Sequence, residues 1–287
     1  MIIVDIYGGL GNQMFQYAAG FSLAKRLNSE LILDLSAFEN IPINQTPRNF
    51  ELDIFNITAQ YQRGRLPRKK NSKLRKVFST LFNCQDNFYN EPHFHYDSKF
   101  PFLRDKVWLH GYWQSFRYFE SNRLLLQKQF SFLKSPSDKN LKLIQDISFS
   151  NSLSIHIRRG DYITNPNSLA HHPVCSIEYY ERALKYVLEN QDSIKCFVFS
   201  DDIPWVKNNL KLPPTSTFIN HNTGALAHED LRLMMSCKHH VIANSSFSWW
   251  AAWLSNAECK LVVAPVIWFK DSSIITSDLI PSNWIRL

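Results

Sequence analysis

The chain has 287 residues, 45% of them hydrophobic and 14% aromatic, which is enough apolar surface for a buried core and excludes a disordered protein. No stretch approaches the ~20 apolar residues that a membrane span needs. Residues 1–7 are too short and too acidic for a signal peptide and predict a strand instead. We therefore expect a cytoplasmic protein of one large domain or two smaller ones.

One segment accounts for the net charge of +7. Residues 63–76 read RGRLPRKKNSKLRK, with eight basic residues and no acid, and subtracting these eight charges leaves −1 for the rest. The segment is either a solvated loop or a patch for peripheral contact with an anionic membrane, where each basic residue contributes about 1 kcal/mol. No nucleic-acid-binding motif accompanies it, so we expect no nucleic-acid partner.

Cysteine and metal patterns also limit the function. The five cysteines are odd in number and form no C-x-x-C pair, which is typical of free thiols in a reducing compartment. No D-x-D sequence occurs, and His171-His172 with Cys175 and the pair His239-His240 lack the spacing of four zinc ligands. We expect neither a metal nor a cofactor.

Taken in chain order, the first elements form a βαβ unit. Residues 2–7 predict a strand, 8–13 a glycine-rich turn, 15–23 a buried helix and 31–35 a second strand. Residues 37–107 read as loops and short helices. A polar stretch at 135–152 suggests a domain boundary, which we place between 148 and 149, giving domains 1–148 and 149–287.

The second half alternates between strand and helix patterns. The expected strands cover residues 153–157, 195–199, 217–220, 240–243 and 260–264, and the expected helices cover 177–188, 203–210, 226–237 and 247–254. This alternation predicts a parallel sheet with helices on both faces, whose ligands bind beyond the carboxyl ends of the strands.

Polar motifs follow several of these strands. In HIRRGDY, at 156–162, Arg158 and Arg159 can fork onto phosphate oxygens, with Asp161 holding one guanidinium; a purely structural Arg–Asp pair is the alternative. In NSSFSWW, at 244–250, a helix N-terminus and two hydroxyls suit an anion, although Ser245 or Ser246 could simply cap the helix. FSDD at 199–202 and Asp230 read first as helix caps.

The turn GGLGNQ, at 8–13, lets a ligand approach the backbone but is neither G-x-G-x-x-G nor a P-loop. Asp34 ends the second strand, where a dinucleotide enzyme keeps its ribose-binding acid. An NAD(P)-dependent oxidoreductase is therefore an alternative, although it leaves the motifs at 156–162 and 244–250 unexplained. A non-enzymatic binder of anionic polymers through residues 63–76 is a third.

Five motifs in order resemble the bacterial α-1,2-fucosyltransferases of glycosyltransferase family 11. They are GGLGNQMFQYAAG at 8–20, HGYWQSFRYF at 110–119, HIRRGDY at 156–162, FSDD at 199–202 and NSSFSWWAAWL at 244–254. The resemblance implies an α/β GT-B-like fold, with two Rossmann-like domains facing across a cleft. It also implies inverting, metal-independent transfer of fucose from GDP-fucose to the 2-hydroxyl of a terminal β-galactoside, with an oligosaccharide, O-antigen or lipid-linked glycan as acceptor.

The resemblance also implies roles for individual residues. Arg158 matches the arginine that contacts the donor diphosphate, and Asp230 resembles an acid that reads the guanine edge. Asn12 matches an asparagine near the reacting centre, and Asp161 is the first candidate for the base, although a path without a strong base is equally open. The remaining donor-side residues are His156, Arg159, Ser245, Ser246, Phe247, Gly9 and Gly11. The acceptor candidates are Tyr112, Trp113 and Gln114, with core packing as the alternative for Trp113.

Overall fold

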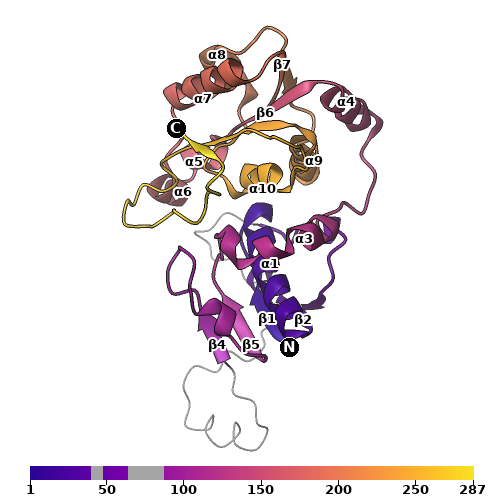
Figure 1. Ribbon diagram of the computed structural model, residues 1–287, viewed down its shortest axis with the longest axis vertical. Helices are drawn as coiled ribbons and strands as arrows, with labels where there is room; N and C mark the ends of the chain where they lie inside the picture. Colours follow the sequence, from indigo (N-terminus) through magenta and orange to yellow (C-terminus); the bar gives the residue numbers. More distant parts are fainter. Residues whose placement is uncertain (40–47, 64–86) are drawn as a thin grey trace, which may run out of the picture. The chain divides into compact units, whose positions relative to one another are not determined.

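The computed structural model describes residues 1–39, 48–63 and 87–287. Contacts divide the chain into two compact units. The N-terminal unit comprises Met1–Leu133 and Ser277–Leu279, and the C-terminal unit comprises Lys134–Thr276 and Ile280–Leu287. Each unit contains one parallel β-sheet with helices packed on it, which confirms the expected α/β class with two Rossmann-like units (Figure 1).

The division falls earlier than the expected boundary between residues 148 and 149. Helix α4 (Asp138–Ser148) packs against α9 (Ala227–Ser236) and β6 (Asn151–Ile157), so it belongs to the C-terminal unit. Its polar composition suggested a linker, but the helix is amphipathic and buries Asn140 and Ile147. The boundary therefore lies between Leu133 and Lys134.

The N-terminal sheet has the strand order β3-β2-β1-β5-β4, and all its pairs are parallel. Its strands are β1 (Ile2–Asp5), β2 (Leu31–Asp34), β3 (Gln60–Gln62), β4 (Asn87–Asn90) and β5 (Val107–His110). The expectation that residues 37–107 are irregular was wrong for β3, β4 and the start of β5. These strands have only three or four residues each and include polar side chains, so they give little periodic signal.

Helix α1 (Leu10–Leu27) connects β1 to β2, as expected. Gly8 begins the turn with φ of 79°, a left-handed conformation that favours glycine. Asn28 ends the helix, also in a left-handed conformation with φ of 49°. The first four turns of the helix are almost wholly buried, so the turn that precedes it is held on a rigid support. Helix α3 (Arg123–Gln129) is the other α-helix in the described part of this unit.

The C-terminal sheet has the strand order β11-β10-β9-β6-β7-β8 and is also parallel. Its strands after β6 are β7 (Ile194–Ser200), β8 (Thr217–Ile219), β9 (His239–Val241), β10 (Val262–Ala264) and β11 (Ile285–Arg286). Its helices besides α4 and α9 are α5 (Gly160–Thr164), α6 (Pro166–His171), α7 (Ile177–Asn190), α8 (Ile203–Asn209) and α10 (Ser246–Leu254). The five expected strands and four expected helices of this half are confirmed, whereas α5, α6 and β11 were not foreseen.

Helices cover both faces of the C-terminal sheet. In Figure 1, α7 and α8 lie on one side, and α9 and α10 lie on the other. Buried side chains of α7 and α8 share a core with alternate residues of β6 and β7, while α10 buries three tryptophans, Trp249, Trp250 and Trp253. The carboxyl ends of β6, β7 and β9 lie at the same edge of the sheet, where parallel sheets bind ligands.

Candidate active site

Two arginines follow β6, and each is paired with an acid that follows β7. Arg158 Nη1 lies 2.9 Å from Asp201 Oδ2, and Arg159 Nε lies 3.4 Å from Asp202 Oδ2. The guanidinium of Arg159 also stacks on the Trp205 ring, 3.6 Å from its centroid. Arg159 is therefore held against α8, whereas Arg158 is oriented by Asp201 at the edge of the sheet.

The acid that orients Arg158 is therefore Asp201, a residue that the sequence suggested only as a helix cap. Gly160 allows this arrangement, because a Cβ there would lie 2.8 Å from Asp201 Oδ2. Asp202 does cap α8, as expected, since its Oδ1 accepts from the Trp205 amide at 3.1 Å. The backbone of Asp161 lies in α5, but its side chain is outside the described part of the structure, so its role as base stays a prediction.

His156 is a buried, neutral imidazole in β6. Burial, together with the nearby positive charge of Arg158, lowers the pKa of His156 to about 4. Its Nδ1 has no hydrogen-bond partner among the described residues, and its ring lies 6.0 Å from that of Phe247 in α10. A buried nitrogen without a partner costs about 1–3 kcal/mol, so this atom suits a hydrogen bond to a ligand or a water molecule.

The backbone amides at the start of α10 are available to a group that accepts hydrogen bonds. Ser245 occupies the N-cap position, but its side chain makes no capping hydrogen bond, so the plain-cap alternative does not describe it. Asn244 fixes the preceding turn by donating to the carbonyl oxygens of Pro173 and Trp268. The first amides of the helix, with the hydroxyls of Ser245 and Ser246, therefore form a fixed group of donors that suits an anion.

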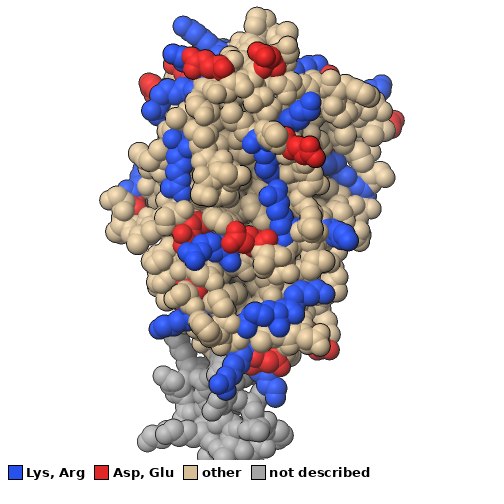
Figure 2. Space-filling view, in the orientation of Figure 1, with Lys and Arg blue, Asp and Glu red and all other residues tan. Residues whose placement is uncertain are grey.

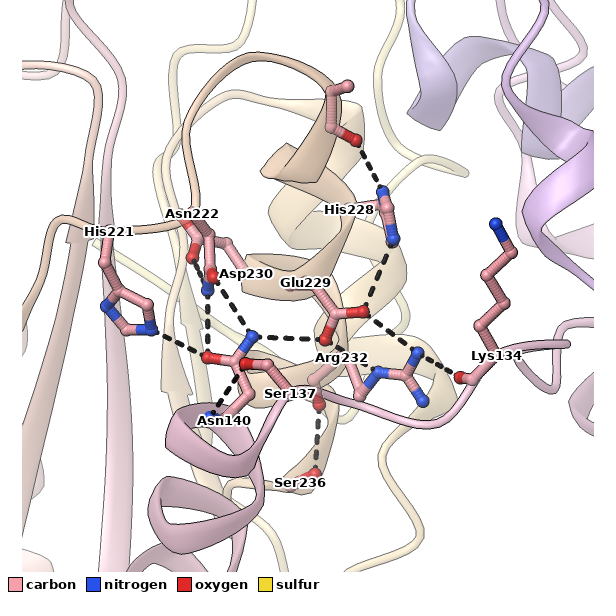
Figure 3. A network of polar contacts seen from close by, with 11 residues as sticks. Lys134, Ser137, Asn140, His221, Asn222, His228, Glu229, Asp230, Arg232 and Ser236 are labelled. Carbon is pink, nitrogen blue, oxygen red and sulfur yellow. Dashed lines mark hydrogen bonds and ion pairs between the residues drawn. The ribbon is translucent and has the colours of Figure 1, made fainter.

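A polar network surrounds Asp230 at the start of α9 (Figure 3). Asp230 Oδ1 accepts from Asn222 Nδ2 at 2.8 Å, and Asn222 in turn contacts Asn140 of α4. Burial, together with the negative charge of Glu229, raises the pKa of Asp230 to about 7. Its neighbour Glu229 is bound on both oxygens by Arg232, at 3.0 Å each. Glu229 therefore anchors the network, while Asp230 can accept from a ligand.

The glycine-rich turn of the N-terminal unit is held by amide side chains. Gln13 bonds to the Gly8 carbonyl at 2.8 Å and to the backbone at Asn49 and Glu51. Asn12, the candidate near the reacting centre, accepts a hydrogen bond from Gln114 at 2.8 Å. Gly9 is half-buried in the turn, and Gly11 lies in the buried first turn of α1. The turn is thus a rigid surface beside β1.

Asp34 does not fit the role that an oxidoreductase would give it. Its side chain is 2% exposed, and its Oδ1 accepts from the Ser36 amide at 2.8 Å. A ribose hydroxyl would have to enter the core to reach this carboxylate, whose Oδ2 has no hydrogen-bond partner among the described residues. Asp34 Oδ1 therefore holds the backbone of the following turn at Ser36, which gives a structural role to the residue that suggested NAD(P) binding.

The three acceptor candidates occupy different environments. Tyr112 is exposed, and its ring packs edge-on against Tyr7, with centroids 5.1 Å apart. Trp113 is completely buried in the aromatic core with Phe100 and Tyr118, so core packing describes it. Gln114 is buried as well and supports Asn12. Of the three, Tyr112 is the side chain that can reach a sugar.

Three charged or titratable residues of this unit were missed as site candidates: Asp5, Glu91 and His110. Asp5 and His110 end the neighbouring strands β1 and β5, and Glu91 directly follows β4. His110 lies in the motif at 110–119, which is the signal that could have found it. Asp5 was expected inside a strand at residues 2–7, and the structure places it at the carboxyl end of β1. Glu91 gave no signal, because β4 was not foreseen.

The surface charge and the described helices concern two further predictions, contact with a membrane and the absence of a metal. On the face shown in Figure 2, basic side chains are scattered among acidic ones. Residues 64–76 of the basic segment lie outside the described residues, so contact with an anionic membrane stays a prediction. No helix in the described ranges is both long and apolar enough to cross a bilayer. Within those ranges, His, Cys, Asp and Glu side chains form no group of three or more suited to a metal ion.

Comparison with known proteins gives consistent results. Glycosyl transferase family 11 matches residues 1–287. An alpha-1,2-colitosyltransferase of Escherichia coli is 34% identical, covering 100% of this chain and 99% of the relative. The O-antigen biosynthesis glycosyltransferase WbnK of Escherichia coli is also 34% identical, covering 98% of each chain. A mouse galactoside 2-alpha-L-fucosyltransferase, Sec1, is 24% identical, covering 90% of this chain and 65% of the relative.

A solved structure supports the fold. Fucosyltransferase NodZ from Bradyrhizobium has a TM-score of 0.50 at 15% identity, covering 87% of this chain and 91% of that one. Identity at this level speaks for the fold and not for the substrate. The match over the whole length, together with two relatives at 34% identity, is decisive for the family: the chain is a glycosyltransferase that belongs to glycosyl transferase family 11.

Proposed function

We propose that the chain is an inverting α-1,2-fucosyltransferase that transfers fucose from GDP-fucose to the 2-hydroxyl of a terminal galactoside without a metal ion. The arrangement at the carboxyl edge of the C-terminal sheet carries this proposal. Arg158, oriented by Asp201, and the uncapped start of α10 follow neighbouring strands of that sheet. They supply positive charge and hydrogen-bond donors of the kind that a nucleotide diphosphate requires.

Transfer places negative charge on the diphosphate as the bond to the sugar breaks. Arg158, the hydroxyls of Ser245 and Ser246 and the amides of α10 can stabilise this charge, because fixed donors need no reorganisation during the reaction. A hydrogen bond to a charged group contributes about 1.5–3 kcal/mol. Several such contacts can replace a bridging metal ion in this role, which is why we propose metal-independent transfer.

The nucleoside would use the other polar groups of the C-terminal unit. Guanine presents two adjacent N–H donors, and the carboxylate of Asp230 is an acceptor that matches them. The neutral His156 and the ring of Phe247 lie together between β6 and α10, where they can contact the nucleotide. A nucleobase that lacks these two N–H donors would leave the Asp230 carboxylate unpaired, which favours guanine over adenine.

The linkage and the sugars rest on the relatives. A 34% identical protein is named for α-1,2 transfer, and a more distant one for transfer to a galactoside. The first of these names concerns colitose, so a colitosyl donor is the second candidate. The O-antigen role named for another relative makes a lipopolysaccharide glycan the proposed natural acceptor.

One reaction tests the proposal. The purified protein is incubated with GDP-fucose and lactose, with and without EDTA, and the products are read by mass spectrometry and NMR linkage analysis. We expect fucose on the galactose 2-hydroxyl in equal yield in both samples. If the protein transfers sugar from GDP-colitose but not from GDP-fucose, GDP-colitose replaces GDP-fucose as the proposed donor. Loss of product with EDTA would contradict the metal-independent reaction. Failure with all β-galactosides, together with undetectable GDP binding, would overturn the proposal.

A further inference from the structure

A buried carboxylate orients a partly exposed imidazole at the carboxyl edge of the N-terminal sheet. Asp5 Oδ2 lies 2.5 Å from His110 Nδ1, and Asp5 Oδ1 accepts from Trp108 Nε1 at 2.6 Å. The Asp5 side chain is 3% exposed, whereas that of His110 is 41% exposed. The two residues end the adjacent parallel strands β1 and β5, so the backbone fixes their spacing.

This arrangement determines which ring nitrogen of His110 can accept a proton. An ionised carboxylate accepts hydrogen bonds but cannot donate one, so the neutral imidazole carries its proton on Nδ1. The lone pair is then on Nε2, at the opposite side of the ring from Asp5. When Nε2 takes up a proton, the carboxylate stabilises the imidazolium that forms.

The surroundings of His110 suit a sugar. Its ring packs between those of Tyr7, 5.6 Å away, and Phe88, 5.8 Å away, and Tyr7 packs in turn on Tyr112. Phe88 and Tyr112 are both exposed, so their rings are accessible for stacking on a sugar. These rings lie beside the β1–α1 turn, at the edge where parallel sheets bind their ligands.

The other polar groups of this edge are engaged in holding the backbone. The two carboxylate oxygens of Glu91 accept from the amides of Tyr112 and Trp113, at 2.7 and 3.0 Å. Asn12 Oδ1 accepts from Gln114. Glu91 and Gln114 thus shape the site, whereas His110 presents a nitrogen that can act on a ligand.

We propose that His110 is the catalytic base that takes the proton from the acceptor hydroxyl, with Asp5 as its positioning residue; this rests on the proposed glycosyl transfer. The acceptor oxygen forms a bond to the anomeric carbon of the donor sugar. The bond from that carbon to the diphosphate oxygen breaks, and its electron pair leaves with GDP. The hydroxyl proton passes to His110 Nε2, which later releases it to water.

The test compares His110→Ala with His93→Ala, which removes an exposed imidazole of the same unit. A general base contributes about 10²–10⁴-fold, so kcat of His110→Ala should fall by at least about a hundredfold. The affinity for GDP should be unchanged, because the proposed nucleotide groups belong to the C-terminal unit. Added imidazole should restore part of the lost turnover by occupying the space of the missing ring. His93→Ala should keep wild-type turnover.

Asp5→Asn provides an independent variant. Trp108 Nε1 can only donate, so it will hold the amide oxygen and turn the amide nitrogen toward His110. That nitrogen donates to Nδ1 and forces the proton onto Nε2, where it blocks proton uptake. We expect a loss of turnover similar to that of His110→Ala at unchanged GDP affinity. The acid side of the wild-type pH profile of turnover should be lost in this variant, because the nitrogen proposed to take up the proton already carries one.

The pH profile needs one control, because other titratable groups face His110. These are Asp5, Glu91, Tyr7 and Tyr112. Burial raises the pKa of Glu91 to about 7, so its own titration could be mistaken for that of the base. Glu91→Gln should therefore retain the acid side of the profile.

The outcomes separate the two proposals. If the wild type transfers fucose and His110→Ala does so equally well, the assignment of the base is overturned while the proposed function stands. A loss that imidazole does not restore, with weaker GDP binding or a lower unfolding midpoint, would make His110 structural and also overturn it. If the wild type transfers no sugar to any galactoside and does not bind GDP, the proposed function itself fails.

Discussion

Arg158 and Arg159 are adjacent in sequence, yet their side chains contact different partners. Arg159 is fixed by Asp202 and by stacking on Trp205, whereas Arg158 is oriented by Asp201 at the edge of the sheet. The sequence could give both residues the same phosphate-binding role. We therefore propose Arg158 for contact with the diphosphate, whereas Arg159 is held against α8.

Replacing Arg158 by lysine should therefore lower turnover by at least roughly a hundredfold. A single ammonium cannot reproduce the two-pronged contact of a guanidinium, and each 1.36 kcal/mol lost in the transition state is about tenfold in rate. Steady-state kinetics with saturating acceptor measures the effect. Arg159→Lys is the matched control and should lose much less turnover. Near wild-type turnover in Arg158→Lys would contradict the proposed contact of Arg158 with the diphosphate.

The raised pKa of Asp230 leads us to predict that GDP binding depends on pH. The ionised carboxylate is the form that accepts from guanine, and the pKa of Asp230 in the free protein is raised to about 7. Affinity should then be constant above that pH and fall by up to about tenfold per pH unit below it.

Isothermal titration calorimetry between pH 5 and 8 would measure this dependence. The β-phosphate of GDP titrates in the same range, so Asp230→Asn is the control: it retains the phosphate effect and lacks the carboxyl effect. Identical pH dependence in wild type and Asp230→Asn would show that the carboxylate does not bind the base.

Among the helices, α7 and α10 begin with the same residue type but differ in how serine is used. Ser176 accepts from the Tyr179 amide and caps α7, whereas Ser245 makes no cap on α10. A serine that leaves its own helix uncapped has its hydroxyl available for a ligand.

Ser245→Ala and Ser176→Ala therefore form a matched pair. Loss of a cap costs about 1 kcal/mol, so Ser176→Ala should lower the free energy of unfolding by that amount with little effect on donor affinity. Ser245→Ala should have the opposite pattern, with weaker GDP binding and almost unchanged stability. Urea unfolding and calorimetry measure the two quantities. A clear stability loss in Ser245→Ala without weaker GDP binding would contradict the anion site.

Across the whole molecule, the buried acids of both units predict a common pH effect on stability. The pKa of Glu91 in the N-terminal unit and of Asp230 in the C-terminal unit is raised to about 7. The folded protein then binds protons more tightly than the unfolded chain. The resulting stabilisation is complete below pH ~4 and is lost as pH rises through ~7. Buried His156 acts in the opposite sense, because its pKa is lowered to about 4.

The double variant Glu91→Gln with Asp230→Asn isolates the acids from the histidines. Its free energy of unfolding relative to wild type should increase between pH 5 and 8, since wild type loses stability there and the variant does not. Urea unfolding followed at several pH values in the absence of GDP measures the difference. A difference that is independent of pH would mean that neither carboxyl is protonated in the folded protein at pH 5.

The sequence by itself determined the class of fold and most of the C-terminal unit. Alternating strand and helix patterns from residue 153 onward predicted five strands and four helices but not the short α5, α6 and β11, because only longer periodic segments are set by local hydrophobic order. The family could also be predicted from the sequence, since the motifs at 8–20, 156–162 and 244–254 occur in the order that the family has. The short strands β3, β4 and β5 were missed, in whole or in part, because segments of three or four residues carry little periodicity of their own.

Tertiary structure alone decided which residues meet. Asp201 lies 43 residues after Arg158 and Asp5 lies 105 residues before His110, and pairing between parallel strands joins both pairs. It also decided that Trp113 is a core residue and that Asp34 is buried, with its Oδ1 accepting from the Ser36 amide, because burial depends on neighbours distant in sequence. Local sequence fixes the elements, whereas strand order and packing select the side chains that reach one edge of a sheet.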